Sequence, residues 1–208
     1  MKPVHNTINT RRSMTQLKKS EGFDQALVSS TIQDVLKNTP SAFNSQSSGA
    51  LVIYGETHEA FWEEVRAGVL PLVSDEKAQV RTNNKINGFK AGDGTVIFLE
   101  NQTINQSLRE RFPLYASSVD LWADQGQGFV QYGVWLALHE LGFGVSLQHY
   151  NPLIDDYIYD VLGVERHFKI VGQMPFGAIN GQPNNKSFVP MTQRFFDCLL
   201  YTSDAADE

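Results

Sequence analysis

The stretch Pro40-Ser41-Ala42-Phe43-Asn44-Ser45-Gln46-Ser47-Ser48 stands directly before an apolar run, Ala50-Leu51-Val52-Ile53-Tyr54. Small side chains and amides in a turn let the backbone approach a flat polar heterocycle closely. About one helix earlier, Thr10-Arg11-Arg12-Ser13 sets two fixed cations beside a hydroxyl. Paired guanidinium groups suit a phosphate, because each offers a planar fork of donors. Together the two segments predict the two ends of a nucleotide-type cofactor site.

The composition is typical of a globular protein with one core. The chain has 208 residues, 41% of them hydrophobic, and a net charge of −6; one domain is the default at this length. It lacks the basic excess of a nucleic-acid binder, an apolar run of membrane-span length and the apolar core of a signal peptide. A single cysteine excludes a disulfide framework, and no paired-cysteine or His-x-x-x-His motif predicts a metal site. We therefore expect a cytoplasmic protein without metal, nucleic acid or membrane as a partner.

The end of the chain, residues 198–208, differs in character from the rest. The string Cys198-Leu199-Leu200-Tyr201-Thr202-Ser203-Asp204-Ala205-Ala206-Asp207-Glu208 resembles the translation of a transposase-type sequencing adapter. We interpret it as a non-native tail, and residues 1–197 as a single domain; the alternative is an ordinary acidic tail. Removing it takes away three of the 23 acidic residues and changes the net charge from −6 to −3.

Periodicity predicts helices that alternate with four short strands. Helices are predicted over 20–38, from Thr57 as N-cap to about Gly68, within 71–94, over 101–112, and from Asn151-Pro152 as N-cap and first residue to Gly163. Strands are predicted over 51–54, 94–99, 144–149 and 167–171. This alternation indicates α/β or α+β, and the pattern alone does not choose between them.

The strongest helix signal covers Ser117–Leu141. Its apolar residues occupy much of the circumference, which is typical of a helix buried in a core or in an interface. Gly126, Gly128 and Gly133 permit close approach of a neighbouring helix, and Gly142 is a natural C-cap. We expect this helix to carry more apolar surface than one small domain covers.

Five motifs, in this order, resemble the nitroreductase family of FMN-dependent oxidoreductases, and more narrowly its subgroup of fungal fatty-acid-repression proteins and related bacterial nitroreductases. The resemblance runs from about Thr7 to about Phe195, on the segments Arg11–Ser13, Pro40–Gln46, Asn87–Gly94, Leu141–Pro152 and Pro175–Gly177. It implies an α+β fold, with a mixed, mainly antiparallel sheet of four to five strands flanked by helices. It also implies a homodimer with the flavin at the interface, the long helix at the two-fold axis and the C-terminal segment wrapped onto the partner.

The resemblance assigns one group of residues to the FMN phosphate. By resemblance these residues are Arg11, Arg12, Ser13, Lys186 and Arg194. The chain departs from the family at two positions, because Phe188 stands where an arginine is usual and Thr15 where a second basic residue is frequent. The phosphate site is therefore expected to have fewer cations than in other members.

A second group is assigned to the flavin ring. By resemblance, Pro40, Ser41 and Ala42 pack against the isoalloxazine held mainly by the other subunit, with Asn44 and Gln46 nearby. Asn87 is implied to bond the pyrimidine edge, and Lys90 to lie at the N1–C2=O end, where a cation favours the reduced ring. The strand end Gln148, His149 and Tyr150 is implied to pass close to N5, where a backbone N–H can bond the ring.

The reaction implied by the resemblance is ping-pong. NADH or NADPH gives hydride to flavin N5, and a nitroaromatic, quinone or similar flat acceptor then takes the electrons at the same place. No side chain is predicted to be catalytic. The alternatives are a flavin reductase or other electron-transfer member of the same fold, and a non-enzymatic flavin-binding regulatory or stress protein. No Gly-x-Gly-x-x-Gly follows a strand, so a Rossmann dinucleotide site is not predicted.

Overall fold

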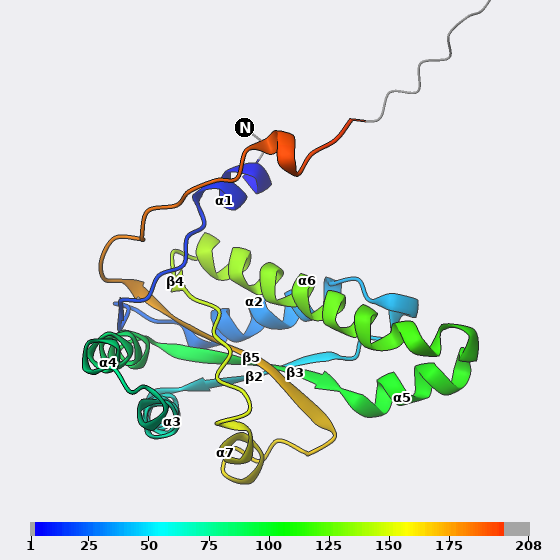
Figure 1. Ribbon diagram of the computed structural model, residues 1–208, viewed down its shortest axis with the longest axis horizontal. Coiled ribbons are helices and arrows are strands. Elements are labelled where there is room, and N and C mark those ends of the chain that lie inside the picture. Colours follow the sequence, from blue (N-terminus) through cyan, green and yellow to red (C-terminus); the bar gives the residue numbers. More distant parts are fainter. Residues whose placement is uncertain (1–2, 198–208) are drawn as a thin grey trace, which may run out of the picture.

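One antiparallel sheet of five strands forms the centre of the molecule (Figure 1). The computed structural model describes residues 3–197, so the predicted non-native tail at 198–208 lies outside the described residues. The strands are β1 (Leu17–Lys18), β2 (Ser48–Tyr54), β3 (Gly94–Asn101), β4 (Gly144–Val145) and β5 (Phe168–Ile179). Their order is β1-β5-β3-β2, with β4 also paired to β5. All ladders are antiparallel, and a parallel bridge joins Ser13 to Val145.

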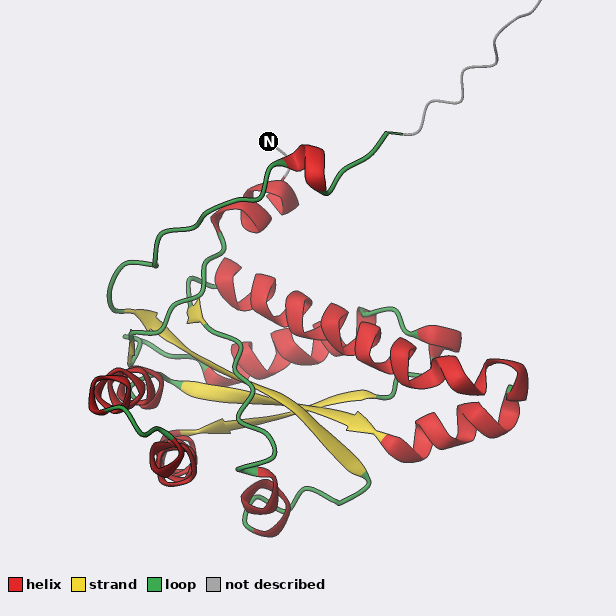
Figure 2. Ribbon diagram, in the orientation of Figure 1, coloured by secondary structure: helices red, strands yellow, loops and turns green. Residues whose placement is uncertain are grey.

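Helices cover both faces of the sheet (Figure 2). They are α1 (Pro3–Thr10), α2 (Gln25–Asn38), α3 (Gly55–Val69), α4 (Glu76–Lys90), α5 (Gln102–Arg111), α6 (Val119–Glu140) and α7 (Asp155–Asp160). Short 3₁₀ turns are η1 (Ala42–Asn44), η2 (Leu70–Leu72), η3 (Pro113–Ser118) and η4 (Met191–Gln193). The α+β class and the mainly antiparallel sheet that the sequence predicts are confirmed.

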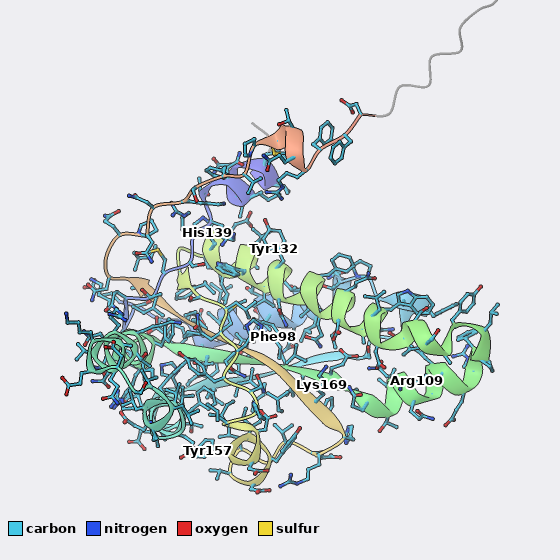
Figure 3. The ribbon with its side chains drawn as sticks, in the orientation of Figure 1. Phe98, Arg109, Tyr132, His139, Tyr157 and Lys169 are labelled. Atoms are coloured by element: carbon cyan, nitrogen blue, oxygen red, sulfur yellow. The ribbon has the colours of Figure 1, made fainter. Side chains whose placement is uncertain are left out.

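The central strand β3 explains why the core has two halves. Its side chains alternate between the faces of the sheet, as the pleat requires. Val96 and Phe98 pack with α2 and α6, whereas Ile97 and Leu99 pack with α3, α4 and α7. Figure 3 labels Phe98 under α6, and all four side chains are at most 7% exposed. The apolar run that predicted a strand is therefore a strand buried on both sides.

Three helices begin where a side chain caps the free N–H groups of the first turn. Asp24, Asp75 and Asn101 accept from the backbone N–H three residues later, at 3.0, 2.7 and 3.1 Å. The predicted cap at Thr57 is wrong, because α3 already begins at Gly55 and Thr57 lies in its first turn.

The predicted start of a helix at Asn151-Pro152 is also wrong, since α7 begins at Asp155. The reason lies in the Asn151 side chain, which bonds Gln173 at 2.9 Å and Asp155 at 2.5 Å instead of capping a helix.

Two more differences from the predicted elements lie near the ends of the chain. β5 extends to Ile179, well past the predicted 167–171, and α1 and β1 were not predicted. Within residues 3–197, no helix has both the length and the apolar character to cross a membrane.

A buried histidine ties α3 to the sheet. His58 is fully buried; its Nε2–H donates to the Lys90 carbonyl at 3.2 Å and its Nδ1 lies 2.9 Å from the Thr95 hydroxyl. Trp62 Nε1 donates to the same hydroxyl at 2.9 Å. Burial, and to a smaller extent the charge of Lys19, lower the pKa of His58 to about 4.

We expect this histidine to make stability depend on pH. His58 stays neutral in the folded protein down to about pH 4, whereas it takes up a proton near pH 6.5 when unfolded, so stability is full above that pH and is lost as pH falls. The free energy of unfolding should decrease by about 2 kcal/mol between pH 7 and pH 5 from this group alone. Urea unfolding at both pH values measures it. His58→Asn should reduce this pH dependence.

Candidate functional site

The segment Arg11–Ser13 is fixed between α1 and the sheet. The Arg11 N–H donates to the Thr7 carbonyl at 3.0 Å, which closes the last turn of α1. Two residues further, Ser13 bridges Val145 and the Met14 N–H donates to the Val145 carbonyl at 2.9 Å. The α1 helix is itself held on α6, because Thr7 Oγ1 donates to Glu140 at 2.7 Å. The predicted phosphate-binding residues therefore stand on a rigid segment.

Arg11 is a half-buried cation without an anionic partner among the described residues. Its guanidinium lies over the Trp135 ring of α6, 4.4 Å from the ring centroid. Its Nε is buried, and within residues 3–197 no acceptor faces it. Buried donors are normally satisfied, so this arrangement indicates a missing acceptor. Arg66 Nε is also buried without a partner, but the guanidinium groups of Arg66, Arg109 and Arg166 each pair with a carboxylate, and that of Arg11 does not.

Arg12 joins the N-terminal segment to the segment that follows β5. Its guanidinium donates to the Asn184 carbonyl. Between the two segments lies a cavity of about 210 Å³. It is lined by Thr10, Arg12, Met14, His139, Ile179 and 181–183. Asn184 stands two positions before Lys186 in the sequence, and Lys186 is also predicted to bind phosphate. The structure therefore brings Arg12 to the segment that contains Lys186.

Lys186 and Arg194 are exposed on an arm, residues 180–197, that leads away from the sheet (Figure 1). The Lys186 ammonium lies 4.9 Å from the ring centroid of Phe188, the residue that replaces the usual arginine. Arg194 follows η4 near the end of the arm, and among the described residues its side chain bonds none of Arg11, Arg12 and Ser13. The phosphate roles of Lys186 and Arg194 stay predictions.

The loop Pro40–Ser48 adopts a tightly constrained turn. Phe43, Asn44 and Gln46 all have φ of 52°, in the left-handed region that residues other than glycine rarely occupy. The Ser41 hydroxyl accepts from the Gln46 N–H at 2.9 Å. Such a backbone persists only when its surroundings determine it. One contact that holds the loop in place is the stacking of the Phe43 ring on Phe112, with ring centroids 4.2 Å apart.

A buried polar cluster holds the other end of this loop, and the sequence analysis missed it. Glu100 is 2% exposed and accepts from Ser48 at 3.2 Å, from Asn105 at 2.9 Å and from Gln127 at 2.8 Å. The Asn101 N–H donates to the Ser47 carbonyl at 2.9 Å. The signal was present in the sequence, because Glu100 directly follows the apolar run Val96–Leu99.

The residues Pro40, Ser41 and Ala42 line a groove of about 200 Å³ against α6. The opposite wall is formed by Trp122, Gln125, Gly126 and Phe129. Arg11 contacts α6 at Trp135, 13 residues further along the helix. At a rise of about 1.5 Å per residue, Trp135 lies about 9 Å along α6 from Phe129 and about 20 Å from Trp122. The loop and the phosphate residues therefore contact different turns of α6.

Asn87 and Lys90 are both engaged with α3. Lys90 Nζ donates to Glu63 at 2.6 Å, and this bond is the main cause that lowers the pKa of Glu63. Arg66 bonds Glu63 at 2.8 Å and donates to the Asn87 side-chain oxygen. The Asn87 and Lys90 side chains therefore both have polar partners within this chain. Their contacts with the flavin ring stay predictions, and the charge of Lys90 is balanced by Glu63.

A different face of α4 meets the N-terminal segment. Gln16 Nε2 donates to the Asn84 carbonyl at 3.4 Å. At Gly88, a Cβ atom would lie 2.2 Å from the Thr15 carbonyl oxygen and 2.8 Å from Gln16 Nε2. Only glycine lets the two backbones approach so closely. The position of Gly88 inside a helix is thereby explained, since it sets the distance between α4 and the residues after Ser13.

The strand end Gln148–Tyr150 runs beside β5. Gln148 exchanges two backbone bonds with Gln173, at 2.7 and 2.9 Å, and the Tyr150 N–H donates to the Gln173 side chain at 2.9 Å. Burial raises the pKa of Tyr150, whose ring packs edge-on against Trp62. The His149 N–H has no acceptor within residues 3–197. Of the three residues, His149 therefore has the backbone donor that a ligand could use.

Comparison with known proteins identifies the family and the fold. The model of the nitroreductase family matches residues 8–178. Nitroreductase FRM2 of Saccharomyces cerevisiae is 33% identical over 188 residues, which cover 88% of this chain and 92% of that protein. Nitroreductase CinD of Lactococcus lactis, solved with nicotinic acid, superposes with a TM-score of 0.85 and 35% identity over 94% of this chain and 100% of that one; it has also been solved with 4-nitrophenol.

A nitroreductase of Desulfitobacterium hafniense with bound FMN is more distant. It superposes with a TM-score of 0.71 at 17% identity, over 96% of this chain and 100% of that one. This likeness is one of fold.

Proposed function

Because this chain belongs to the nitroreductase family, we propose that it is an FMN-dependent NAD(P)H oxidoreductase that works as a homodimer. The observation that carries the proposal is Arg11, a half-buried guanidinium with no carboxylate partner in the described chain and with a buried, unpartnered Nε. A phosphate supplies the missing negative charge and accepts from the terminal guanidinium nitrogens. The residues present therefore fit FMN, the cofactor bound by a protein of the same fold.

When bound, FMN would supply the redox chemistry between NAD(P)H and an electron acceptor. The chain itself has three tasks. Arg11, Arg12 and Ser13 bind the phosphate. The His149 N–H, which has no acceptor in the described chain, donates to the ring. The loop Pro40–Ser48 covers the ring with small side chains.

We infer that the acceptors are flat aromatic molecules such as nitroaromatics or quinones. CinD, 34% identical, has been solved with 4-nitrophenol, which is such a molecule. In the present chain, Pro40–Ala42 face an aromatic wall that includes Trp122 and Phe129. Aromatic side chains favour flat ligands, because rings stack in offset or edge-on arrangements.

The positions of the loop and of the phosphate residues on different turns of α6 support the proposed dimer. A two-fold axis across α6 sets the start of one helix against the end of its copy, which brings one loop to the phosphate residues of the other chain. The outer face of α6 carries Leu121 and Phe129, each 58% exposed, and Tyr132, 41% exposed. An apolar stripe of this kind is typical of an interface.

The visible spectrum of the purified protein tests the proposal. We expect flavin absorption bands after purification or after addition of FMN, and we expect them to bleach when NADH or NADPH is added without oxygen. Bands that persist would favour a non-enzymatic flavin-binding protein. A protein that shows no flavin spectrum after incubation with FMN contradicts the proposal.

A further inference from the structure

The only described contact that faces the Arg11 guanidinium is an aromatic ring from another element. Trp135 lies on α6, and its ring centroid is 4.4 Å from the guanidinium carbon. An arginine over an indole face is held by attraction between the cation and the ring quadrupole, and tryptophan is the strongest of the aromatic partners. The flat face of Arg11 is thereby occupied, and its edge, which has the donors, is left for a ligand.

Trp135 itself is fixed by packing. Its indole Nε1 is buried and has no acceptor within residues 3–197. The side chain packs against the core cluster formed by α2, α6 and the sheet. A ring held by packing on a long helix is a rigid support, whereas an arginine side chain alone has many rotamers to lose.

We propose that Trp135 is the positioning residue that orients Arg11 toward the cofactor phosphate. This role of Trp135 rests on the proposed function. Trp135 contributes to the affinity for FMN, which has the phosphate, and does not contribute to the affinity for riboflavin, which lacks it. Preference for the phosphorylated flavin thus depends on a residue of α6 as well as on Arg11.

The test compares FMN and riboflavin as ligands of the full-length protein after bound flavin has been removed by dialysis. Trp135→Leu should weaken FMN binding about tenfold, the range of a partly desolvated cation–π contact, and leave riboflavin binding unchanged. Trp135→Phe retains a ring face, so it should recover most of the FMN affinity. In an Arg11→Ala background, Trp135→Leu should have no further effect, because the two residues act as one unit.

Three outcomes would overturn the inference. These are unchanged FMN affinity in Trp135→Leu, an equal loss for FMN and riboflavin, and a loss that persists when Arg11 is already alanine. Trp135→Met, whose flexible side chain fills irregular space, replaces the leucine variant if that one does not fold, with the same expected result. Absence of FMN binding by the wild-type protein would contradict the proposed function instead, so the two failures are distinguishable.

Discussion

Replacing Gly88 by alanine is expected to displace the segment that follows Ser13 and to weaken both folding and FMN binding. The added Cβ would lie 2.2 Å from the Thr15 carbonyl oxygen, which is backbone and has no flexible end that can yield. Overpacking of this kind lowers the free energy of unfolding by about 1–3 kcal/mol. Because Thr15 lies two residues after Ser13, FMN affinity should fall as well. Urea unfolding and titration with FMN measure the two effects.

Gly68→Ala is the matched control, since Gly68 also lies inside a helix. A Cβ there would be 3.5 Å from Leu153 Cβ, an ordinary contact. Alanine is the better helix former, so this variant should gain up to about 1 kcal/mol. Equal stability of Gly88→Ala and Gly68→Ala would show that α4 and the N-terminal segment are not in close contact.

Introducing a charge at Tyr132 is expected to dissociate the dimer and to remove the flavin. Tyr132 is on the outer face of α6 (Figure 3), between the groove of the loop and Trp135 along the helix. Tyr132→Asp would place an unpaired carboxylate in the proposed interface, and such burial costs several kcal/mol. Because each site needs residues of both chains, flavin content should fall together with the dimer. Sedimentation velocity at both the protein and the flavin absorption bands follows both quantities.

Two controls belong to this prediction. Tyr132→Phe keeps the apolar ring and should leave the dimer intact. Val80→Asp adds the same charge at a 60% exposed apolar residue of α4, outside the proposed interface, and should also leave it intact. A Tyr132→Asp monomer that keeps its full flavin content would refute the shared site.

The fold could largely be predicted from the sequence, because its main signals are local. An apolar, β-branched run such as Val96–Leu99 fits a buried strand wherever it is placed. The long apolar helix acts through neighbouring residues in the same way. One of the errors occurred where a distant partner decides. Asn151 was predicted to be a cap, but its side chain bonds Gln173, which comes from another strand.

The candidate site, too, has features that the sequence predicts and features that only the tertiary structure decides. Its residue types are local information: guanidinium groups beside a serine indicate phosphate, and small side chains in a turn indicate close approach to a ring. What each side chain meets is decided by the tertiary structure. Asn87 and Lys90 are engaged with Arg66 and Glu63 of α3, and no spacing within the chain predicts that pairing.

The sequence by itself, through its family resemblance, determined the class of fold and the family, and it predicted the chemistry of two binding segments. Only the tertiary structure decided that Arg11 lies over Trp135, that Glu100 holds the loop, and that the loop and the phosphate residues contact different turns of α6. The physical reason is the separation along the chain between the residues that interact. Propensity, capping and side-chain chemistry act within a few residues, whereas cation–π contacts and buried hydrogen bonds depend on where distant segments of the chain lie.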